Sequence, residues 1–354
     1  MNRPYKLAVF TTTQPHHSSK SGYEQIAHHV GPDHTLWRTR NNTPPLPKRG
    51  MAKLLRRFAL SNWYQWDGIE AESRFLRLSR RYQKHLVAHF LYGDTSLGML
   101  PRFRRLFKGK MVATIHACPS DFDRVLANFH LLRNIDFLIL LGGNQRRYLL
   151  EAGLPKNKML TVPHGVDLSF YKPAPQKSYE KNTFRVLSVG NWRRNFKLYH
   201  QVIKAYGDDP NIRFDVVTAR HNQEQFSGYR NVQTYDGLGD EELLELYQHT
   251  DCVLLGLEDA VANNVLLESM ACAKPVIVED VGAVTDYVDQ NSAMLIKPDD
   301  AGAAVDAIRG LRTNPDKAKH IGRKAHEQVK RFDWPIVANE LQAVYEMVHH
   351  NLNR

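Results

Sequence analysis

The sequence predicts an α/β protein made of two doubly wound domains. Apolar runs short enough for buried strands alternate with helix-period segments along most of the chain, which is typical of parallel sheets. The clearest case is residues 252–288, CVLLGLEDAVANNVLLESMACAKPVIVEDVGAVTDYV, which describe a strand, a loop, a helix and a second strand. A polar segment with prolines, residues 172–182, separates two such series, and 354 residues suffice for two domains. We therefore place the first domain at residues 1–172 and the second at residues 183–334.

The first domain begins with a strand, a polar loop and a helix, an arrangement that suits phosphate binding. The strand is expected at residues 6–13 and the helix at residues 23–30, and Gly22 between them permits close approach of the backbone to a ligand. No GxGxxG motif occurs, which argues against a nicotinamide or flavin dinucleotide. Further alternating elements are predicted as strands at 34–40, 85–93, 111–117, 137–141 and 159–163, and helices at 52–63, 69–86, 123–135 and 144–152.

The second domain repeats the alternation after the polar segment. Its strands are predicted at residues 184–189, 212–219, 231–235, 252–257, 275–279 and 293–297. Its helices are predicted at residues 196–206, 241–249, 265–272 and 301–312, followed by a long helical tail from residue 317 that Trp334 and Pro335 interrupt.

The chain is basic, with a formal net charge of +11 and an isoelectric point near 9.5. Such a charge favours anionic partners: nucleotide phosphates, anionic lipid or nucleic acid. Lys and Arg concentrate at residues 48–57, 74–84 and 102–110, interleaved with apolar and aromatic residues. The pattern suits a basic amphipathic surface on an anionic membrane, and ordinary solvated helix faces explain it as well. Nucleic acid is the less favoured partner because the sequence carries no recognised nucleic-acid-binding motif.

The cysteines and the apolar runs bear on the compartment. Cys118, Cys252 and Cys272 are too few, and too apolar in context, for a disulfide framework, and they fit a reducing cytoplasm. No apolar run approaches the roughly 20 residues of a membrane span, and the N-terminal apolar core is too short for a signal peptide. We therefore expect a cytoplasmic protein that associates peripherally with the inner face of the cell membrane through its basic surface.

Glu268 is the residue of the 252–288 block that fits an apolar helix least well. It lies one turn into a helix flanked by buried strands, where a carboxylate needs a partner. Either a neighbouring protein group satisfies it, or it accepts hydrogen bonds from ligand hydroxyls near a helix start whose N–H groups attract phosphate. In open α/β sheets ligands bind at the carboxyl ends of the strands, and this helix begins there.

A cluster of cations follows the strand at residues 184–189. Gly190, Arg193, Arg194 and Lys197 come directly after its carboxyl end. Clustered cations at this position suit a diphosphate, and a solvated loop is the alternative. Two doubly wound domains would enclose a cleft, and we expect these side chains to face it.

Three further groups resemble metal or catalytic sites. His116 stands at the carboxyl end of the strand at 111–117, where either a site role or a capping and packing role suits it. Asp121 and Asp123 form a DxD triplet, but N-capping and dipole compensation at a helix start explain both acids. His16, His17, His28 and His29 lack a carboxylate or cysteine at ligand spacing. We therefore predict no metal.

Together these residues resemble the retaining glycosyltransferases of family 4, which have the GT-B fold. The block ANNVLLESMACAKPVIVEDVGAVTDYV is similar to the family's most diagnostic segment, a nucleotide-binding helix followed by a strand. VPHGVDLSFYKP resembles the interdomain segment and VLSVGNWRRNFK the first strand and phosphate loop, whereas FLYGD and VATIHACP are weaker matches. The resemblance implies two Rossmann-like domains facing a cleft, with a C-terminal helix at about residues 335–354 returning to the N-terminal domain.

The resemblance also implies roles. Glu268 matches the second Glu of the E-x7-E motif, which accepts hydrogen bonds from the nucleotide ribose. The turn at Asn263, Asn264 and Val265 presents backbone amides to the donor. Arg193, Arg194 or Lys197, beside Gly190, would hold the diphosphate and stabilise its departure. Gly22 would face the phosphates, and His116 would approach the donor sugar.

The chain departs from the family pattern at two places. Ala260 stands where the first Glu of the motif belongs, and Glu258 and Asp259 could substitute for it if the loop is shifted. Asn191 occupies the usual position of an Arg. The resemblance implies a metal-independent, cofactor-free transfer of sugar from a UDP-, GDP- or ADP-sugar to a lipid-linked or cell-surface glycan. The alternative is a catalytically impaired relative that binds a nucleotide or glycan.

Overall fold

The computed structural model describes residues 3–13, 20–40, 46–174, 183–207 and 209–350. The chain divides into two compact units, formed mainly by Ser21–His164 and by Gly165–Asp333, and the C-terminal segment from Trp334 belongs to the first. We call them unit 1 and unit 2. The division after His164 precedes the expected linker at residues 172–182, of which residues 175–182 lie outside the described part.

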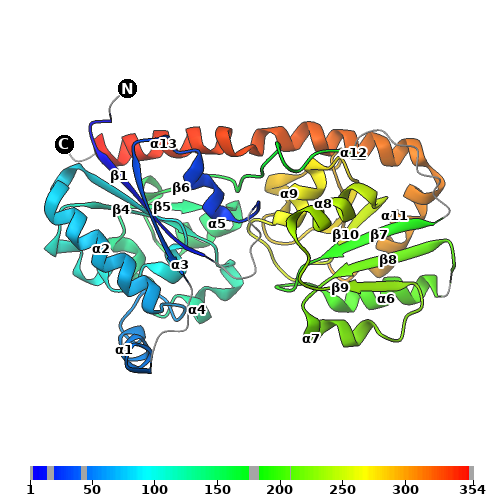
Figure 1. Cartoon of the computed structure of the whole chain (residues 1–354), viewed down its shortest axis with the longest axis horizontal. Coiled ribbons are helices and arrows are strands. Elements are labelled where there is room, and N and C mark those ends of the chain that lie inside the picture. Colours follow the sequence, from blue (N-terminus) through cyan, green and yellow to red (C-terminus); the bar gives the residue numbers. More distant parts are fainter. Residues whose placement is uncertain (1–2, 14–19, 41–45, 175–182, 208, 351–354) are drawn as a thin grey trace. The chain divides into compact units, whose positions relative to one another are not determined.

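Unit 1 is built on a six-stranded parallel sheet in the order β2-β1-β3-β4-β5-β6 (Figure 1). The inner strands β3 to β5 are almost wholly buried, as expected for a parallel sheet covered on both faces. The predicted strands are confirmed, with bounds β1 Lys6–Thr13, β2 His34–Arg40, β3 Leu86–Phe90, β4 Lys110–Ile115, β5 Phe137–Leu140 and β6 Met159–Thr161.

The helices of unit 1 are shorter and more irregular than predicted. The segment expected as a helix at residues 23–30 is a 3-10 helix, η1 Tyr23–His28. The first α-helix begins earlier than expected because its proline, Pro47, falls in the first turn, where it needs no N–H partner. The α-helices are α1 Leu46–Arg56, α2 Trp66–Tyr82, α3 Gly93–Ser96, α4 Phe122–Val125 and α5 Gly143–Glu151; further 3-10 turns are η2 Gln83–His85, η3 Leu100–Leu106, η4 Pro119–Asp121, η5 Phe129–Asn134 and η6 Lys156–Lys158.

The helix predicted at residues 123–135 is wrong. The chain there forms only α4 and η5, because tertiary hydrogen bonds take the backbone groups that a helix would use. Asn62 donates from its backbone to Val125 O and from its side chain to Arg124 O, and the Asn128 N–H donates to Leu60 O. N-capping by Asp121 is wrong as well, since that side chain makes no capping bond and pairs with Arg124 at 2.8 Å.

Unit 2 contains a second six-stranded parallel sheet, in the order β12-β11-β10-β7-β8-β9 (Figure 1). Helices α8 and α9 pack with one apolar cluster, and α6 and α11 with another that includes alternate residues of the same strands. The predicted elements are confirmed within a few residues: β7 Phe184–Val189, α6 Phe196–Tyr206, β8 Ile212–Val217, β9 Val232–Tyr235, α8 Asp240–His249, β10 Cys252–Leu255, α9 Asn264–Ala271, β11 Val276–Glu279, β12 Met294–Ile296, α11 Ala301–Thr313 and α12 Pro315–Val329. Two short helices, α7 Arg220–Gln223 and α10 Val284–Tyr287, and two 3-10 turns, η7 Glu224–Phe226 and η8 Lys330–Phe332, complete the unit.

The C-terminal helix α13, Trp334–His350, is part of unit 1 and contacts β3 and η1. Its attachment includes a buried polar chain. The ring of His89 on β3 shares one hydrogen bond with the Tyr345 hydroxyl, at 2.6 Å, and a second with the Thr114 hydroxyl, at 2.7 Å. The ring is completely buried on a buried strand, so the imidazole is held neutral.

Because His89 is buried and neutral, we expect unit 1 to lose stability at acidic pH. Burial lowers the pKa of His89 from 6.5 to about 3, so the unfolded chain binds this proton more readily than the folded chain. Stability from the neutral imidazole is complete above pH 6.5 and falls as the pH drops towards 3. The slope from this group approaches about 1.4 kcal/mol per pH unit. Urea unfolding measures the free energy of unfolding at each pH in this range. That free energy should depend less steeply on pH in His89→Gln than in the parent, and equal pH dependence would contradict the assignment.

Candidate functional site

The candidate site of unit 2 lies where three neighbouring strands end. Strands β7, β10 and β11 are adjacent in the sheet and parallel, so the loops that follow them share one edge. Backbone hydrogen bonds join the loop after β7 to the loop after β10. Asn195 N donates to Gly256 O at 3.2 Å, and the backbones of Arg194 and Leu257 form an isolated antiparallel β-bridge. The loop after β11 joins them through Ala283 N, which donates to Ala260 O at 2.9 Å.

A buried carboxylate that sequence reasoning missed fixes these loops. Glu279 ends β11 and is completely buried. Its oxygens accept hydrogen bonds from Leu257 N at 2.6 Å, Asn195 Nδ2 at 2.9 Å and Asp299 N at 2.7 Å. A carboxylate that closes an apolar strand was the available signal in the sequence, because burying it requires such donors. Glu279 therefore acts on the architecture of the site.

Helix α9 places Glu268 behind this edge. The Asn263 side chain caps the helix by accepting from Leu266 N at 3.2 Å, and Asn264 and Val265 form its first turn. Glu268 is only 4% exposed, and its Oε2 accepts a hydrogen bond from the Tyr247 hydroxyl at 2.8 Å. Burial and the neighbouring carboxylate raise the pKa of Tyr247 well above its usual value, so the phenol stays protonated and donates. After Glu279, Tyr247 on α8 is the second residue of the site that sequence reasoning missed.

The loop after β7 has a closely packed backbone. Gly190 adopts a φ of 111°, and a Cβ there would lie 2.4 Å from Nη2 of Arg194. The Arg194 guanidinium donates to Val189 O at 2.7 Å and to Trp192 O at 3.0 Å. Burial lowers the pKa of Arg194, while Tyr199, Tyr247 and Glu268 act in the opposite direction. The Arg194 guanidinium is thus held by two carbonyl groups of its own loop, and the negative charge of Glu268 favours its charged form.

Arg193 adopts a left-handed backbone conformation, with a φ of 55°. Its carbonyl accepts from Glu258 N at 3.1 Å, and its Nη1 lies 3.9 Å from Oε2 of the exposed Glu258. Lys197 is the second residue of α6, with Nζ 3.5 Å from Oδ1 of Asp299 in a pair in which both side chains are exposed. An exposed pair of this kind contributes little to stability, so the Lys197 charge can reorient towards an anion.

The departures from the family pattern have structural counterparts. Ala260 is buried, and its carbonyl lies 2.1 Å from where a Cβ on Gly282 would be. Asp259 Oδ1 accepts from Ala260 N at 2.8 Å. Asn191 Oδ1 accepts from the Thr218 hydroxyl at 2.8 Å and from the backbone of Ala219, which ties the ends of β7 and β8 together.

In unit 1 the structure brings Gly22 and His116 together through one aromatic ring. Gly22, with a φ of 100°, directly precedes Tyr23, and the Tyr23 and His116 rings meet edge to face at 5.1 Å. The Tyr92 ring stacks on the His116 ring with their centroids 4.6 Å apart. His116 Nε2 shares a 2.8 Å hydrogen bond with Leu91 O, which fixes the orientation of the imidazole.

Asp94 supports the His116 segment from beneath. Its Oδ2 accepts from the backbone N–H groups of His116, at 2.9 Å, and Ala117, at 2.7 Å. The carboxyl is buried, and burial raises the pKa of Asp94 to about 6 despite these hydrogen bonds. Tyr23, Tyr92 and Asp94 were not among the predicted site residues, because their spacing in the sequence gives no sign that they surround one histidine.

Within the described ranges no three His, Cys, Asp or Glu side chains gather where they could share a metal ion. Asp121 is paired with Arg124, and His28 lies in η1, where burial lowers its pKa. His16 and His17 lie outside the described residues.

The glycosyl transferases group 1 family matches residues 172–328, which cover most of unit 2. Solved structures of the same architecture cover nearly the whole chain. Sucrose-phosphate synthase from Thermosynechococcus elongatus aligns with a TM-score of 0.73 at 16% identity, covering 98% of this chain and 100% of the other. Alr3699/HepE of Anabaena, in complex with UDP and glucose, aligns with a TM-score of 0.70 at 14% identity, covering 97% and 99%. The fold is that of the GT-B glycosyltransferases, and the segment at residues 172–328 matches the group 1 family.

Curated relatives that match the chain bear the names of glycosyltransferases. A D-inositol 3-phosphate glycosyltransferase of Corynebacterium aurimucosum is 24% identical over 66% of this chain and 62% of its own length. A phosphatidyl-myo-inositol mannosyltransferase of Mycobacterium leprae is 26% identical over 69% of each chain. The chain thus spans about two thirds of the length of these relatives. Among the helices that the structure describes, none combines the length and apolarity needed to cross a bilayer.

Proposed function

We propose that the protein transfers a sugar from a nucleoside-diphosphate sugar to a hydroxyl group, with retention of anomeric configuration and without a metal or other cofactor. The observation that carries this proposal is the carboxyl edge of the unit 2 sheet. There a buried carboxylate, Glu268, lies one turn inside a capped helix start, and the adjoining loop carries Arg193 and Arg194. A carboxylate for ribose hydroxyls beside cations for a diphosphate is the combination that a nucleoside diphosphate requires.

In this proposal the ribose hydroxyls donate to Glu268 while the Tyr247 hydroxyl keeps that carboxylate in place. Arg193, Arg194 and Lys197, with the first N–H groups of α9, stabilise the negative charge that grows on the leaving diphosphate. The acceptor oxygen attacks the anomeric carbon from the face that the diphosphate leaves and passes its proton to the departing phosphate oxygen, so the new bond keeps the old configuration. His116 and Gly22 are assigned to the donor sugar and phosphates. Protein groups mainly position the reactants.

The donor and the reaction are tested together by measuring UDP, GDP and ADP release from a panel of nucleotide sugars, with inositol phosphates, phosphatidylinositol and glycan fragments as acceptors. UDP-sugars come first, because the Anabaena structures hold UDP and UDP-glucose. Inositol-containing acceptors come first, because two relatives are named for them. Acceptor-dependent release of one nucleotide, with the anomeric configuration kept in the product, is the expected result.

A second candidate function is nucleotide or glycan binding without transfer, and Ala260 favours it. The family carries a carboxylate at this position, whereas here the methyl side chain is buried and Glu258 and Asp259 make other contacts. Tight nucleotide binding with neither transfer nor hydrolysis across the panel would establish this alternative. Turnover with any donor would exclude it.

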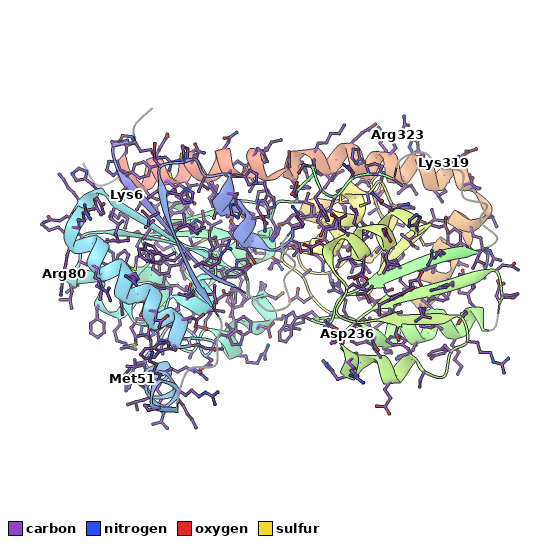
Figure 2. All side chains as sticks on the ribbon, in the orientation of Figure 1. Lys6, Met51, Arg80, Asp236, Lys319 and Arg323 are labelled. Atoms are coloured by element: carbon purple, nitrogen blue, oxygen red, sulfur yellow. The ribbon has the colours of Figure 1, made fainter. Side chains whose placement is uncertain are left out.

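We also propose that unit 1 binds an anionic membrane through a basic apolar surface on α1, the residues after it and η3. Its exposed hydrophobic side chains are Met51, Leu54, Phe58, Phe103 and Leu106. The two segments are in contact, since Arg102 Nε donates to Phe58 O at 3.0 Å. Figure 1 shows α1 projecting from the body of unit 1, and Figure 2 places Met51 on it. The same segments carry exposed cations, among them Lys48, Arg49, Lys53, Arg57 and Arg105. Apolar groups that enter the headgroup region beside cations that meet anionic lipid define such a surface.

Replacing Arg102 and Arg105 with Gln should lower binding to phosphatidylserine-containing vesicles by about 30-fold, at about 1 kcal/mol per cation. Arg104 is left in place because it pairs with Asp136 at 2.8 Å. Sedimentation with and without phosphatidylserine measures the effect. The matched control is Arg80→Gln with Arg81→Gln, at the exposed end of α2. Leu54→Ala should also weaken binding, whereas the exposed Leu160 on β6 can be replaced without effect. If the parent protein leaves the vesicles unbound, the surface has another role.

A further inference from the structure

The loop after β7 presents an exposed tryptophan beside the proposed diphosphate cations. Trp192 is 62% exposed, the largest aromatic side chain among the exposed hydrophobic residues of the described chain. Indole rings are usually mostly buried, because removing their large apolar surface from water stabilises the fold. The family resemblance assigns no role to this position.

The backbone that carries Trp192 is fixed on both sides. Before it, Gly190 N donates to Val217 O at 2.9 Å, and Asn191 accepts from the Thr218 hydroxyl at 2.8 Å. At the residue itself, the Trp192 carbonyl accepts from Arg194 Nη1 at 3.0 Å. After it, the Arg193 carbonyl accepts from Glu258 N at 3.1 Å. The indole is therefore exposed on a backbone with little freedom, which is the arrangement expected of a preorganised ligand contact.

The loop is also tied to the other residues proposed to bind the donor. Arg194, whose guanidinium holds the Trp192 carbonyl, experiences the charge of Glu268. Arg193, the next residue, contacts Glu258 after β10. Trp192 thus stands on the loop proposed to hold the diphosphate, to which the donor sugar is directly bonded. A hexopyranose presents a face of C–H groups with partial positive charge, and the face of an indole ring is negative. Stacking of the two surfaces needs no hydrogen-bond partner, so it suits an exposed ring.

We propose that Trp192 is a binding platform for the apolar face of a hexopyranose at this site, and this inference rests on the proposed function. The sugar can come from the donor or from a glycan acceptor, because both present the same face. In this proposal the nucleotide and the sugar are recognised by different residues. Carboxylates and cations of the site recognise the nucleotide, whereas the indole recognises the ring shape of the sugar and favours sugars with an uninterrupted C–H face.

The test compares the parent with Trp192→Ala and Trp192→Phe by calorimetric titration with matched probes: UDP against UDP-glucose, GDP against GDP-mannose, and ADP against ADP-glucose. In the donor arm, the parent binds one nucleotide sugar more tightly than its nucleotide. Trp192→Ala should weaken that nucleotide sugar about tenfold and leave the nucleotide unchanged. Trp192→Phe, which keeps an aromatic face, should restore most of the difference. In the acceptor arm, free hexopyranosides and disaccharides should bind the nucleotide-loaded parent and lose about tenfold in Trp192→Ala.

The outcomes separate the platform from the function on which it rests. If Trp192→Ala leaves every nucleotide, nucleotide sugar and free sugar unchanged, the platform is overturned while the donor site stands. If the nucleotide and its sugar conjugate weaken equally, Trp192 stacks on the base or supports the loop, and the sugar assignment is wrong. If the parent binds no nucleotide of the panel, the proposed function fails first and the platform fails with it. Equal loss of sugar binding in Trp192→Ala and Trp192→Phe would also count against stacking, because phenylalanine keeps an aromatic face and should retain most of the contact.

Discussion

Glu268→Gln should lower the affinity for the nucleotide by about 10- to 100-fold without unfolding unit 2. The carboxylate is buried on α9 and accepts from Tyr247. Glutamine keeps one oxygen for that phenol, so the internal contact survives, but it cannot offer two charged oxygens to the ribose hydroxyls. Hydrogen bonds to a charged acceptor are worth more than neutral ones, which sets the size of the effect. Calorimetric titration with the nucleotide that the parent binds measures it.

The matched control is Glu245→Gln on the neighbouring helix α8, where the side chain is exposed. This variant removes the same charge and should bind the nucleotide like the parent. A 2′,3′-dideoxynucleotide provides a second check, because Glu268→Gln should not weaken its binding further. Nucleotide affinity in Glu268→Gln equal to that of the parent would show that the carboxylate only supports Tyr247, and the ribose assignment would have to be abandoned.

Gly190→Ala should reduce binding of a nucleoside diphosphate strongly while affecting the nucleoside much less. A Cβ at this position would lie 2.4 Å from Nη2 and 2.8 Å from Cζ of Arg194, closer than real carbon contacts. The guanidinium must move, and its bonds to Val189 O and Trp192 O are lost. The φ of 111° adds backbone strain of about 1–3 kcal/mol for any residue with a Cβ. Comparing titrations with a nucleoside and its diphosphate separates the cation from the rest of the site.

Gly237→Ala is the control for the backbone strain alone. Gly237 also has a positive φ, 67°, but a Cβ there meets nothing within 4 Å. Its variant should lose some stability and keep full diphosphate binding. In a background of Arg194→Lys, Gly190→Ala should cost little further affinity, because the two substitutions act on one interaction. Additive losses in the double variant would mean that the Gly190 effect does not pass through Arg194.

Much of the fold follows from local patterns. Parallel strands buried on both faces are largely apolar runs, so β1, β7 and β10 begin at the residues where the sequence predicts them. The helix α9 is predicted as directly, since its apolar residues recur at helical spacing. The failure at residues 123–135 has the opposite cause: the helix pattern is present, but backbone bonds to Leu60 and Asn62 compete with it. Such bonds join residues far apart in the sequence and leave no local signal.

The sequence by itself determined the alternation of strands and helices, the candidate edge after β7 and β10, and the choice of Glu268, Arg193 and Arg194 as residues to examine. These follow from burial and charge, which each residue carries locally. Only the tertiary structure decided what surrounds them. It showed that Tyr247 holds Glu268, that Glu279 binds three loops together, and that Asp94 and two tyrosines enclose His116. A buried polar group must find its partner wherever the fold brings a donor within reach, and that donor can be any distance away along the chain.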